Sequence, residues 1–161
     1  MDIIRDITEI NFGIFSNRKI KYIVIHYTGA KGSAANNAKY FKSVDRNASA
    51  HYFVDEKEIV QVVEDFHVAW HCGSHNGLYK HNECRNVNSI GIEICCFEDA
   101  PGSYKMKELA IRKAHGLVKE LMLKYNIPKE NILRHYDVTG KKCPMEWAYD
   151  NCTEWEVFIN A

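Results

Sequence analysis

The chain has 161 residues, of which 46% are hydrophobic and 26% are charged, a balance typical of one globular domain. Its 21 basic and 21 acidic side chains cancel, so there is no electrostatic reason to expect nucleic acid or an anionic membrane as the partner. No apolar run approaches the roughly 20 residues of a membrane helix, and the N-terminal MDIIRDITEI is acidic rather than basic and then apolar. We therefore expect a protein made in the cytoplasm without a signal peptide and without stable membrane insertion.

The first half of the chain predicts strands and one helix. Residues 21–26, KYIVIH, are a nearly continuous apolar run rich in β-branched residues, typical of a central strand buried on both faces. Ser33 is expected to cap a helix over about residues 34–45. Two further strands, 50–54 and 58–63, are expected to form a hairpin through residues 55–57.

The second half adds one buried strand, one long helix and a short strand. Residues 89–97, SIGIEICCF, predict the strand, and residues 98–104 a turn. Residues 105–125 carry one apolar stripe at helical spacing. A short strand at 131–134 and a closing helix around 147–158 complete the chain. Because strands alternate with helices but include a hairpin, we expect an α/β domain with a mixed central sheet flanked by helices.

The six cysteines are expected to be reduced thiols, because an intracellular chain with a sizeable core does not need disulfides. Cys95 and Cys96 are adjacent within an apolar run, and we interpret them as small buried hydrophobic residues.

Residues 134–144, RHYDVTGKKCP, hold the densest set of chemically active side chains. His135 and Cys143 supply an imidazole and a thiolate, which suit a borderline-soft ion such as zinc. His26, at the end of its strand, is the best candidate for a third ligand. Three protein ligands and one open position are the pattern of a catalytic zinc site, here expected at one edge of the sheet. The alternative is that His26 is a polar strand end and that the other two are unrelated.

Two charged residues are candidates for catalysis. Glu93 lies within a buried strand, where a carboxylate is unfavourable unless something satisfies it. It is either a general base beside the metal or half of a buried salt bridge. Lys141 either stabilises negative charge on a carbonyl oxygen or is an ordinary solvated lysine.

Other histidines allow further interpretations. His67, His71 and His75 would form an alternative metal triad on a helix, which Gly73 and Gly77 oppose. Trp70 and His71 are expected to line a groove near the site. The candidate substrate-binding residues are therefore His51, Trp70 and His71.

Five segments occur in an order that resembles a known family: YIVIHYTG, SAHYFVD, VAWHCG, NSIGIEI and RHYDVTGKKCP. Together they are similar to the zinc-dependent N-acetylmuramoyl-L-alanine amidases of the type-2 amidase family, which includes phage endolysins and resembles peptidoglycan recognition proteins. The resemblance is strongest over residues 20–145, and we expect residues 1–161 to form a single amidase catalytic domain.

The resemblance implies a role for each site residue. His26, His135 and Cys143 match the ligands of one zinc ion per chain. Lys141 matches a lysine that stabilises the transition state, and Glu93 matches the catalytic acid of bacterial and phage members. The substrate implied is peptidoglycan, cut between N-acetylmuramic acid and L-alanine.

One departure concerns the residue before His51. Some relatives carry a catalytic tyrosine there, whereas this chain has Ala50. Tyr52 is expected to point to the opposite face of its strand. Glu93 is therefore the better candidate for the base.

Three biological settings are compatible with this resemblance. The first is a wall-degrading endolysin or autolysin, released through a phage holin or by lysis, which is either a single-domain lysin or a catalytic domain whose C-terminal wall-binding domain is missing. The second is a cytoplasmic amidase that recycles muropeptides. The third is a non-catalytic peptidoglycan-binding module, which the filled ligand positions disfavour. We expect the first.

Overall fold

The computed structural model describes residues 2–161. The strands are β1 (Ile4–Arg5), β2 (Phe12–Gly13), β3 (Tyr22–Lys31), β4 (Tyr52–Val54), β5 (Ile59–Gln61), β6 (Val68–Ala69), β7 (Ser89–Ala100), β8 (Ser103–Met106) and β9 (Ile132–Arg134). The helices are α1 (Ala34–Ser43), α2 (Glu108–Tyr125), α3 (His135–Thr139) and α4 (Thr153–Asn160), with short 3₁₀ turns at Asn86–Asn88, Lys129–Asn131 and Met145–Trp147.

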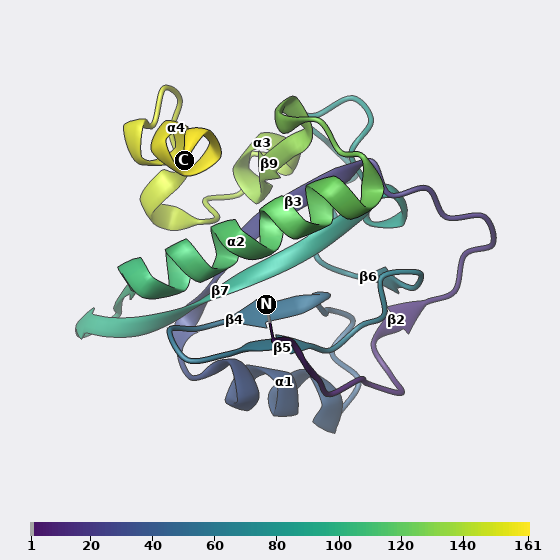
Figure 1. Cartoon of the computed structure of the whole chain (residues 1–161), viewed down its shortest axis with the longest axis horizontal. Coiled ribbons are helices and arrows are strands. Elements are labelled where there is room, and N and C mark those ends of the chain that lie inside the picture. Colours follow the sequence, from purple (N-terminus) through teal and green to yellow (C-terminus); the bar gives the residue numbers. More distant parts are fainter. Residues whose placement is uncertain (1) are drawn as a thin grey trace.

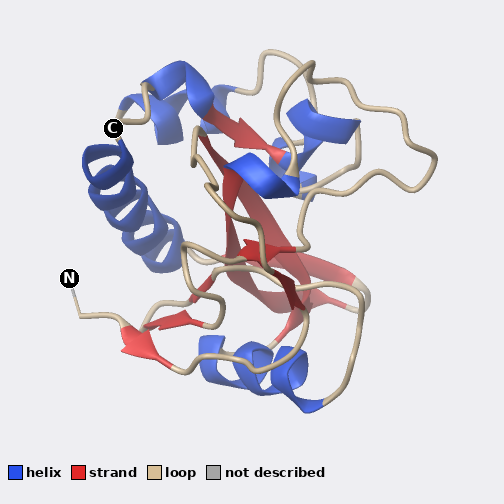
Figure 2. Cartoon of the chain, turned by 90° about the vertical axis from the view of Figure 1, so that its right-hand side faces the viewer, coloured by secondary structure: helices blue, strands red, loops and turns tan. Residues whose placement is uncertain are grey.

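A mixed sheet forms the centre of the molecule, in agreement with the sequence analysis. Within the described residues its strand order is β1-β5-β4-β7-β3-β9, and β8 pairs with the outer half of β7. The central strands β4, β7, β3 and β9 are parallel, and β5 is antiparallel to β4. Figure 1 shows α2 along one face of this sheet and α1 on the other, and Figure 2 shows the strands in the middle of the molecule with helices around them.

The alternation of side chains along β7 separates the core from the site. Ile90, Ile92 and Ile94 face α2 and belong to the main hydrophobic core, where burying each such side chain contributes about 1.5–3 kcal/mol. Glu93 and Cys95 alternate with them and therefore lie on the opposite face. A carboxylate is thus placed on the face that α2 does not cover.

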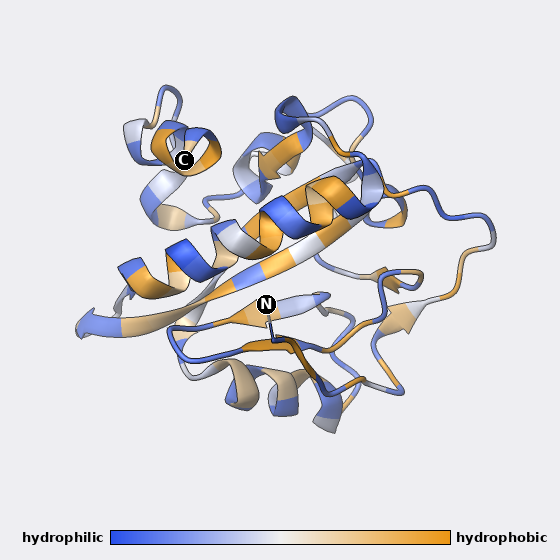
Figure 3. Ribbon diagram, viewed as in Figure 1, coloured by the Kyte–Doolittle hydropathy of each residue, from blue (hydrophilic) through white to orange (hydrophobic). Residues whose placement is uncertain are grey.

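Small and large residues of the helices complete the main core. Ala110 and Ala114 lie on the buried side of α2, where their short side chains let the helix approach the sheet closely. Figure 3 shows polar and apolar residues alternating around this helix. At the C-terminal end, Trp147, Trp155 and Phe158 pack against one another with ring centroids 5.1–5.7 Å apart.

Several predicted elements are confirmed. The strand expected at 21–26 is the start of β3, and the expected hairpin is β4 and β5. Ser33 caps α1, because its Oγ accepts a hydrogen bond from the backbone N–H of Asn36 at 3.1 Å.

The turn predicted at 98–104 is present but is narrower than expected, and the long helix begins later than predicted. β7 continues to Ala100 and pairs with β8 around Gly102, whose φ of +77° suits a tight turn. Because residues 103–106 are used in this pairing, α2 begins only at Glu108. The closing helix is also shorter than expected, since Trp147 lies in a separate 3₁₀ turn before α4.

Among residues 2–161, no helix combines the length and the apolar composition that crossing a lipid bilayer requires.

Asp55 joins three parts of the fold at the end of β4. It is 4% exposed, and its Oδ1 accepts the backbone N–H groups of Lys57 at 2.7 Å and Glu58 at 2.8 Å. Its Oδ2 accepts the N–H of Ala34, at the start of α1, at 2.8 Å. Burial alone would raise the pKa of this carboxyl, but the three N–H groups outweigh burial and lower it.

We therefore expect Asp55→Asn to destabilise the protein by about 1–3 kcal/mol at pH 7, because an amide N–H₂ would face a backbone donor. A lowered folded-state pKa means that the carboxylate stabilises the protein above its unfolded pKa of about 3.9, and that this contribution is lost as pH falls through the folded-state value. Urea unfolding of both proteins from pH 7 to pH 3 measures this.

The exposed Asp45, which accepts one N–H from Asn47, supplies the control Asp45→Asn, for which we expect little change. A difference between wild type and Asp55→Asn that is absent, or equally large at every pH, would contradict the role of the Asp55 charge.

Candidate metal centre and active site

Three potential ligands from distant parts of the sequence meet at one edge of the parallel strands. His26 lies on β3, His135 begins α3 and Cys143 follows α3. Their ligand atoms all lie within 4.8 Å of one another, and the side chains are 1%, 3% and 4% exposed. The predicted set of metal ligands is therefore brought together.

Parallel pairing accounts for the meeting of the two histidines. Ile25 of β3 is in register with Arg134, the last residue of β9, so the residues that follow them, His26 and His135, reach the same level. Their ring centroids are 4.8 Å apart at an interplanar angle of 72°.

A short helix returns the chain so that Cys143 reaches both histidines. α3 ends at Gly140, which has a φ of +81° and so adopts a left-handed conformation that glycine tolerates. The N–H of Tyr136 then donates to the carbonyl of Cys143 at 2.9 Å. Arg134 and Asp137 brace the base of this turn with a two-pronged ion pair, at 2.9 Å and 2.6 Å.

Three buried polar atoms at or beside this cluster have no hydrogen-bond partner among residues 2–161. They are both ring nitrogens of His135 and the Oε2 of Glu93. Leaving such a group unsatisfied costs roughly 1–3 kcal/mol. Two imidazoles and a thiol around one point fit a divalent cation such as zinc, so the chemistry of the residues present agrees with a metal site.

Electrostatics prepare the histidines as ligands. Burial, followed by the charges of nearby groups, lowers the pKa of His26 well below its usual value and that of His135 to about 3, so both rings are neutral at pH 7. Burial, together with Glu93, raises the pKa of Cys143 to about 12. A cation that binds here therefore displaces the thiol proton.

Glu93 lies beside the cluster. It is the register neighbour of His26 across the β3–β7 pair. Burial raises its pKa to about 8, against the opposing charge of Lys141. None of the ion pairs found among residues 2–161 includes Glu93, which disfavours the alternative of a buried salt bridge.

An open cavity of about 570 Å³ gives access to these groups. The exposed Lys141 borders it, and Trp70 and His71 line it, as the sequence predicts. The full wall comprises His26, Tyr27, Thr28, Gly29, Phe41, Ala48, Ser49, Trp70, His71, Glu93, His135, Lys141, Lys142, Cys143 and Met145.

His51 does not lie in this cavity, and we do not retain it as a substrate-binding residue. It is fully buried. Its Nδ1 accepts the backbone N–H of Gly91 at 3.0 Å, and its Nε2 lies 3.2 Å from the carbonyl of His67. The ring is a structural bridge between β4 and β7. The alternative triad of His67, His71 and His75 is not among the groups of residues 2–161 whose geometry could hold a metal ion.

His71 and Ser89 support His26 from behind, an arrangement that the sequence patterns did not predict. The Nδ1 of His71 lies 3.0 Å from the Nε2 of His26, and its Nε2 lies 3.0 Å from the Oγ of Ser89. The ring of His71 packs on Gly91, where an added Cβ would stand 2.5 Å from the ring. A glycine inside an otherwise apolar strand is a signal of such close approach, and it was available from the sequence.

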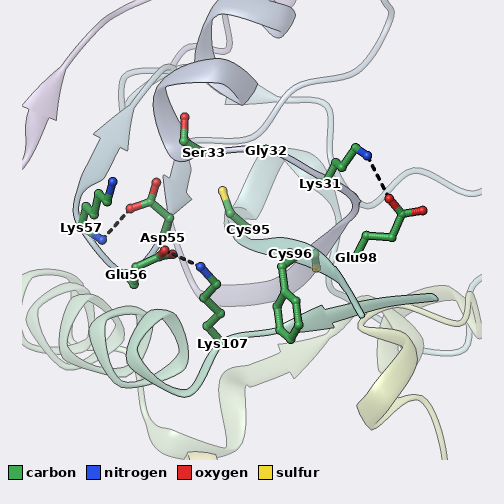
Figure 4. A pocket seen from close by; sticks show the side chains of 11 residues that line it. Lys31, Gly32, Ser33, Asp55, Glu56, Lys57, Cys95, Cys96, Glu98 and Lys107 are labelled. Carbon is green, nitrogen blue, oxygen red and sulfur yellow. Dashed lines mark hydrogen bonds and ion pairs between the residues drawn. The ribbon is translucent and has the colours of Figure 1, made fainter. Parts of the chain in front are cut away.

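A second cavity, of about 390 Å³, lies near the first residues of α1 (Figure 4). Lys31 pairs with Glu98 at 2.9 Å, and Lys107 pairs with Glu56 at 2.5 Å. Cys95, in the middle of the view, is buried with its sulfur 3.6 Å from the amide of Asn37. This cavity contains none of the three cluster residues.

The fold and the cluster agree with the comparison to known proteins. The family described as N-acetylmuramoyl-L-alanine amidase matches residues 16–146, and the chain belongs to this family.

Curated relatives and solved structures support this membership. The chain is 39% identical over 140 residues to a probable N-acetylmuramoyl-L-alanine amidase of Bacillus licheniformis, covering 81% of this chain and 38% of the relative. It is 34% identical over 142 residues to the amidase CwlH of Bacillus subtilis, covering 86% and 51%. The chain thus spans between about two fifths and half of the length of these relatives.

Among solved structures, PlyL superimposes with a TM-score of 0.78 at 29% identity, covering 99% of this chain and 96% of that one. The catalytic domain of XlyA superimposes with a TM-score of 0.77 at 32% identity, covering 99% and 98%.

The unpaired nitrogens of His135 lead to a test of its role as a ligand. We expect His135→Leu to leave the metal-free protein at least as stable as wild type, because it removes two buried polar atoms that have no partner. Zinc at 100 times its dissociation constant would stabilise wild type by about 2.7 kcal/mol and would leave the variant unchanged. Thermal unfolding of chelator-treated protein, with and without zinc, measures both effects.

The exposed His75 supplies the matched control, since His75→Leu should respond to zinc as wild type does. If His135→Leu were stabilised by zinc to the same extent as wild type, His135 would not be a ligand.

Proposed function

We propose that this chain is a zinc-dependent hydrolase that cuts the amide between N-acetylmuramic acid and L-alanine in peptidoglycan and thereby degrades the bacterial cell wall. One observation carries the proposal: a buried His-His-Cys cluster and an unpaired carboxyl, Glu93, share one open cavity. Family membership supplies the bond that is cut.

Zinc is the metal that the donor set favours. Two imidazoles and a thiolate are typical zinc ligands, and a site with three protein ligands keeps a position open for substrate or water. When bound, zinc would supply Lewis acidity to water and to the substrate carbonyl. We propose that His26, His135 and Cys143 hold one zinc ion per chain.

Glu93 is proposed as the general base and then the general acid. A bound cation would lower the raised pKa of Glu93 and favour its carboxylate form. In that form Glu93 accepts a proton from the water that attacks the amide carbon, and a C–O bond forms. It then returns this proton to the nitrogen of L-alanine as the C–N bond breaks. The products are the lactyl carboxylate of the sugar and a free amino group on the peptide.

Lys141 is proposed to stabilise the carbonyl oxygen as it becomes negative. Its charge already lowers the pKa values of His135 and Glu93, so the ammonium lies close enough to act on the cluster. Trp70 offers an indole surface beside the site, on which a sugar or lactyl group can pack. The neighbouring Lys142 also borders the cavity and serves as a comparison.

We further propose that residues 1–161 act as one catalytic unit, made in the cytoplasm and released to the wall through a holin or by lysis. Its partner is peptidoglycan. A muropeptide-recycling amidase would use the same site, so the choice of substrate in the test separates the two.

The test uses purified sacculi and the release of new N-terminal alanine. We expect Glu93→Gln to keep its zinc and to lose activity by a factor of about 10²–10⁴. Lys141→Met should lose a factor of about 10²–10³, whereas Lys142→Met should stay near wild type. Cys143→Ala should lose both zinc and activity.

Activity of Glu93→Gln near the wild-type level would remove Glu93 from the mechanism. Zinc binding without alanine release would indicate a binding module, and cleavage confined to soluble muropeptides would indicate recycling. A wild-type protein without zinc would overturn the proposal.

A further inference from the structure

We propose that His71 is a positioning residue, the centre of a hydrogen-bond chain that runs from the carbonyl of Arg85 through Ser89 and His71 to His26. This hydrogen-bond chain determines which nitrogen of His26 is free to bind the metal. The inference rests on the proposed function in one respect, that His26 binds a metal.

The direction of the chain follows from its first member. The backbone carbonyl of Arg85 can only accept a hydrogen bond, and the Oγ of Ser89 donates to it at 2.7 Å. A hydroxyl has a single proton to donate. At its contact with the Nε2 of His71, 3.0 Å away, the same oxygen therefore accepts, so Nε2 of His71 carries a hydrogen.

The same reasoning assigns a donor and an acceptor nitrogen to both imidazole rings. A neutral imidazole has one N–H and one acceptor nitrogen, so Nδ1 of His71 is an acceptor. It lies 3.0 Å from Nε2 of His26, which therefore donates. The remaining nitrogen, Nδ1 of His26, has a free lone pair and lies 3.7 Å from the sulfur of Cys143. The nitrogen without a proton thus faces the other two ligands.

His71 is held so that this chain has one geometry. Its ring packs on Gly91, where any Cβ would collide with it, and meets the ring of His26 at 89° with centroids 5.1 Å apart. Its backbone N–H donates to the Oδ1 of Asn86 at 3.1 Å. Because His26 and Ser89 use both ring nitrogens, His71 has none left for substrate, in contrast to its predicted role.

Partners of this kind tune metal sites. A histidine ligand commonly donates its other N–H to a carboxylate or a carbonyl, which fixes its tautomer and raises its basicity, and loss of the partner typically weakens metal binding 10–100-fold. Here two side chains connect the ligand to the backbone carbonyl of Arg85, at the start of the segment that leads into β7.

The first experiment uses the unsubstituted protein without metal. Long-range ¹H–¹⁵N NMR of histidine-labelled protein at pH 8 reports which ring nitrogen carries the proton. We expect both His26 and His71 to be protonated at Nε2 alone. A proton on Nδ1 of His26 would overturn the inference, whatever the metal content of the protein.

The second experiment measures zinc affinity by competition with a chelator. His71→Phe keeps a ring against Gly91 but cannot accept a hydrogen bond, and we expect it to bind zinc about 10–100-fold more weakly. His71→Asn places a carbonyl oxygen near the position of Nδ1 and is expected to restore affinity to within several-fold of wild type. Equal losses in both variants, or none in His71→Phe, would overturn the inference.

Further variants separate positioning from folding. Ser89→Ala removes the link to Arg85 and should leave His71 in a mixture of tautomers by NMR, while His75→Phe, in the same loop but exposed, should match wild type in zinc affinity. Unchanged tautomers in Ser89→Ala would contradict the chain. Failure of the proposed function is distinguishable, because wild type would then bind no zinc while the tautomers of the metal-free protein still decide the inference.

Discussion

Parallel pairing of β3 with β7 on one side and with β9 on the other is the constraint on which the site depends. It places His26 beside Glu93 and, through the Ile25–Arg134 register, at the level of His135. A shift of one residue in either pairing would send these side chains to the face covered by α2. The isoleucines of β3 and β7 resist such a shift, because they would leave the core. Hydrophobic packing on one face of the sheet thus determines the positions of the polar site residues on the other face.

The polar face of the sheet carries groups that lower the stability of the protein when no metal is bound. His135 has two buried nitrogens without partners, and Glu93 has one such oxygen. Natural proteins accept such groups mainly at functional sites, because stabilising interactions elsewhere compensate for them. Here the fully buried strands and the aromatic cluster around Trp147 provide that compensation.

Sequence patterns predict the parts of this arrangement that depend on local chemistry. The apolar run before His26 and the Ser33 cap each have a local cause, and each is present in the structure. The meeting of His26 and Cys143, 117 residues apart, was expected from residue types and from resemblance rather than from spacing.

What the sequence did not predict depends on the neighbouring strands. Residues 98–104 were predicted to be a turn, but only Pro101 and Gly102 form it, because the residues on either side pair as β7 and β8. His51 was predicted to contact substrate. Only the tertiary structure shows that its Nδ1 already accepts a hydrogen bond from the backbone N–H of Gly91. The hydrogen-bond chain from Ser89 through His71 is likewise seen only in the tertiary structure, because its members come from separate elements.

The short segment that carries His135 and Cys143 differs in its attachments from the strand that carries His26. β3 lies between two hydrogen-bonded neighbours in the interior of the sheet, whereas the segment after β9 is one short helix and a loop braced by Arg134 and Asp137. Segments with few backbone partners open locally at lower free energy than central strands do. Amide hydrogens of residues 136–143 would therefore exchange with solvent well before those of β3 and β7. We therefore expect His135 and Cys143 to separate from His26 by local opening of this segment at a lower free energy than global unfolding requires.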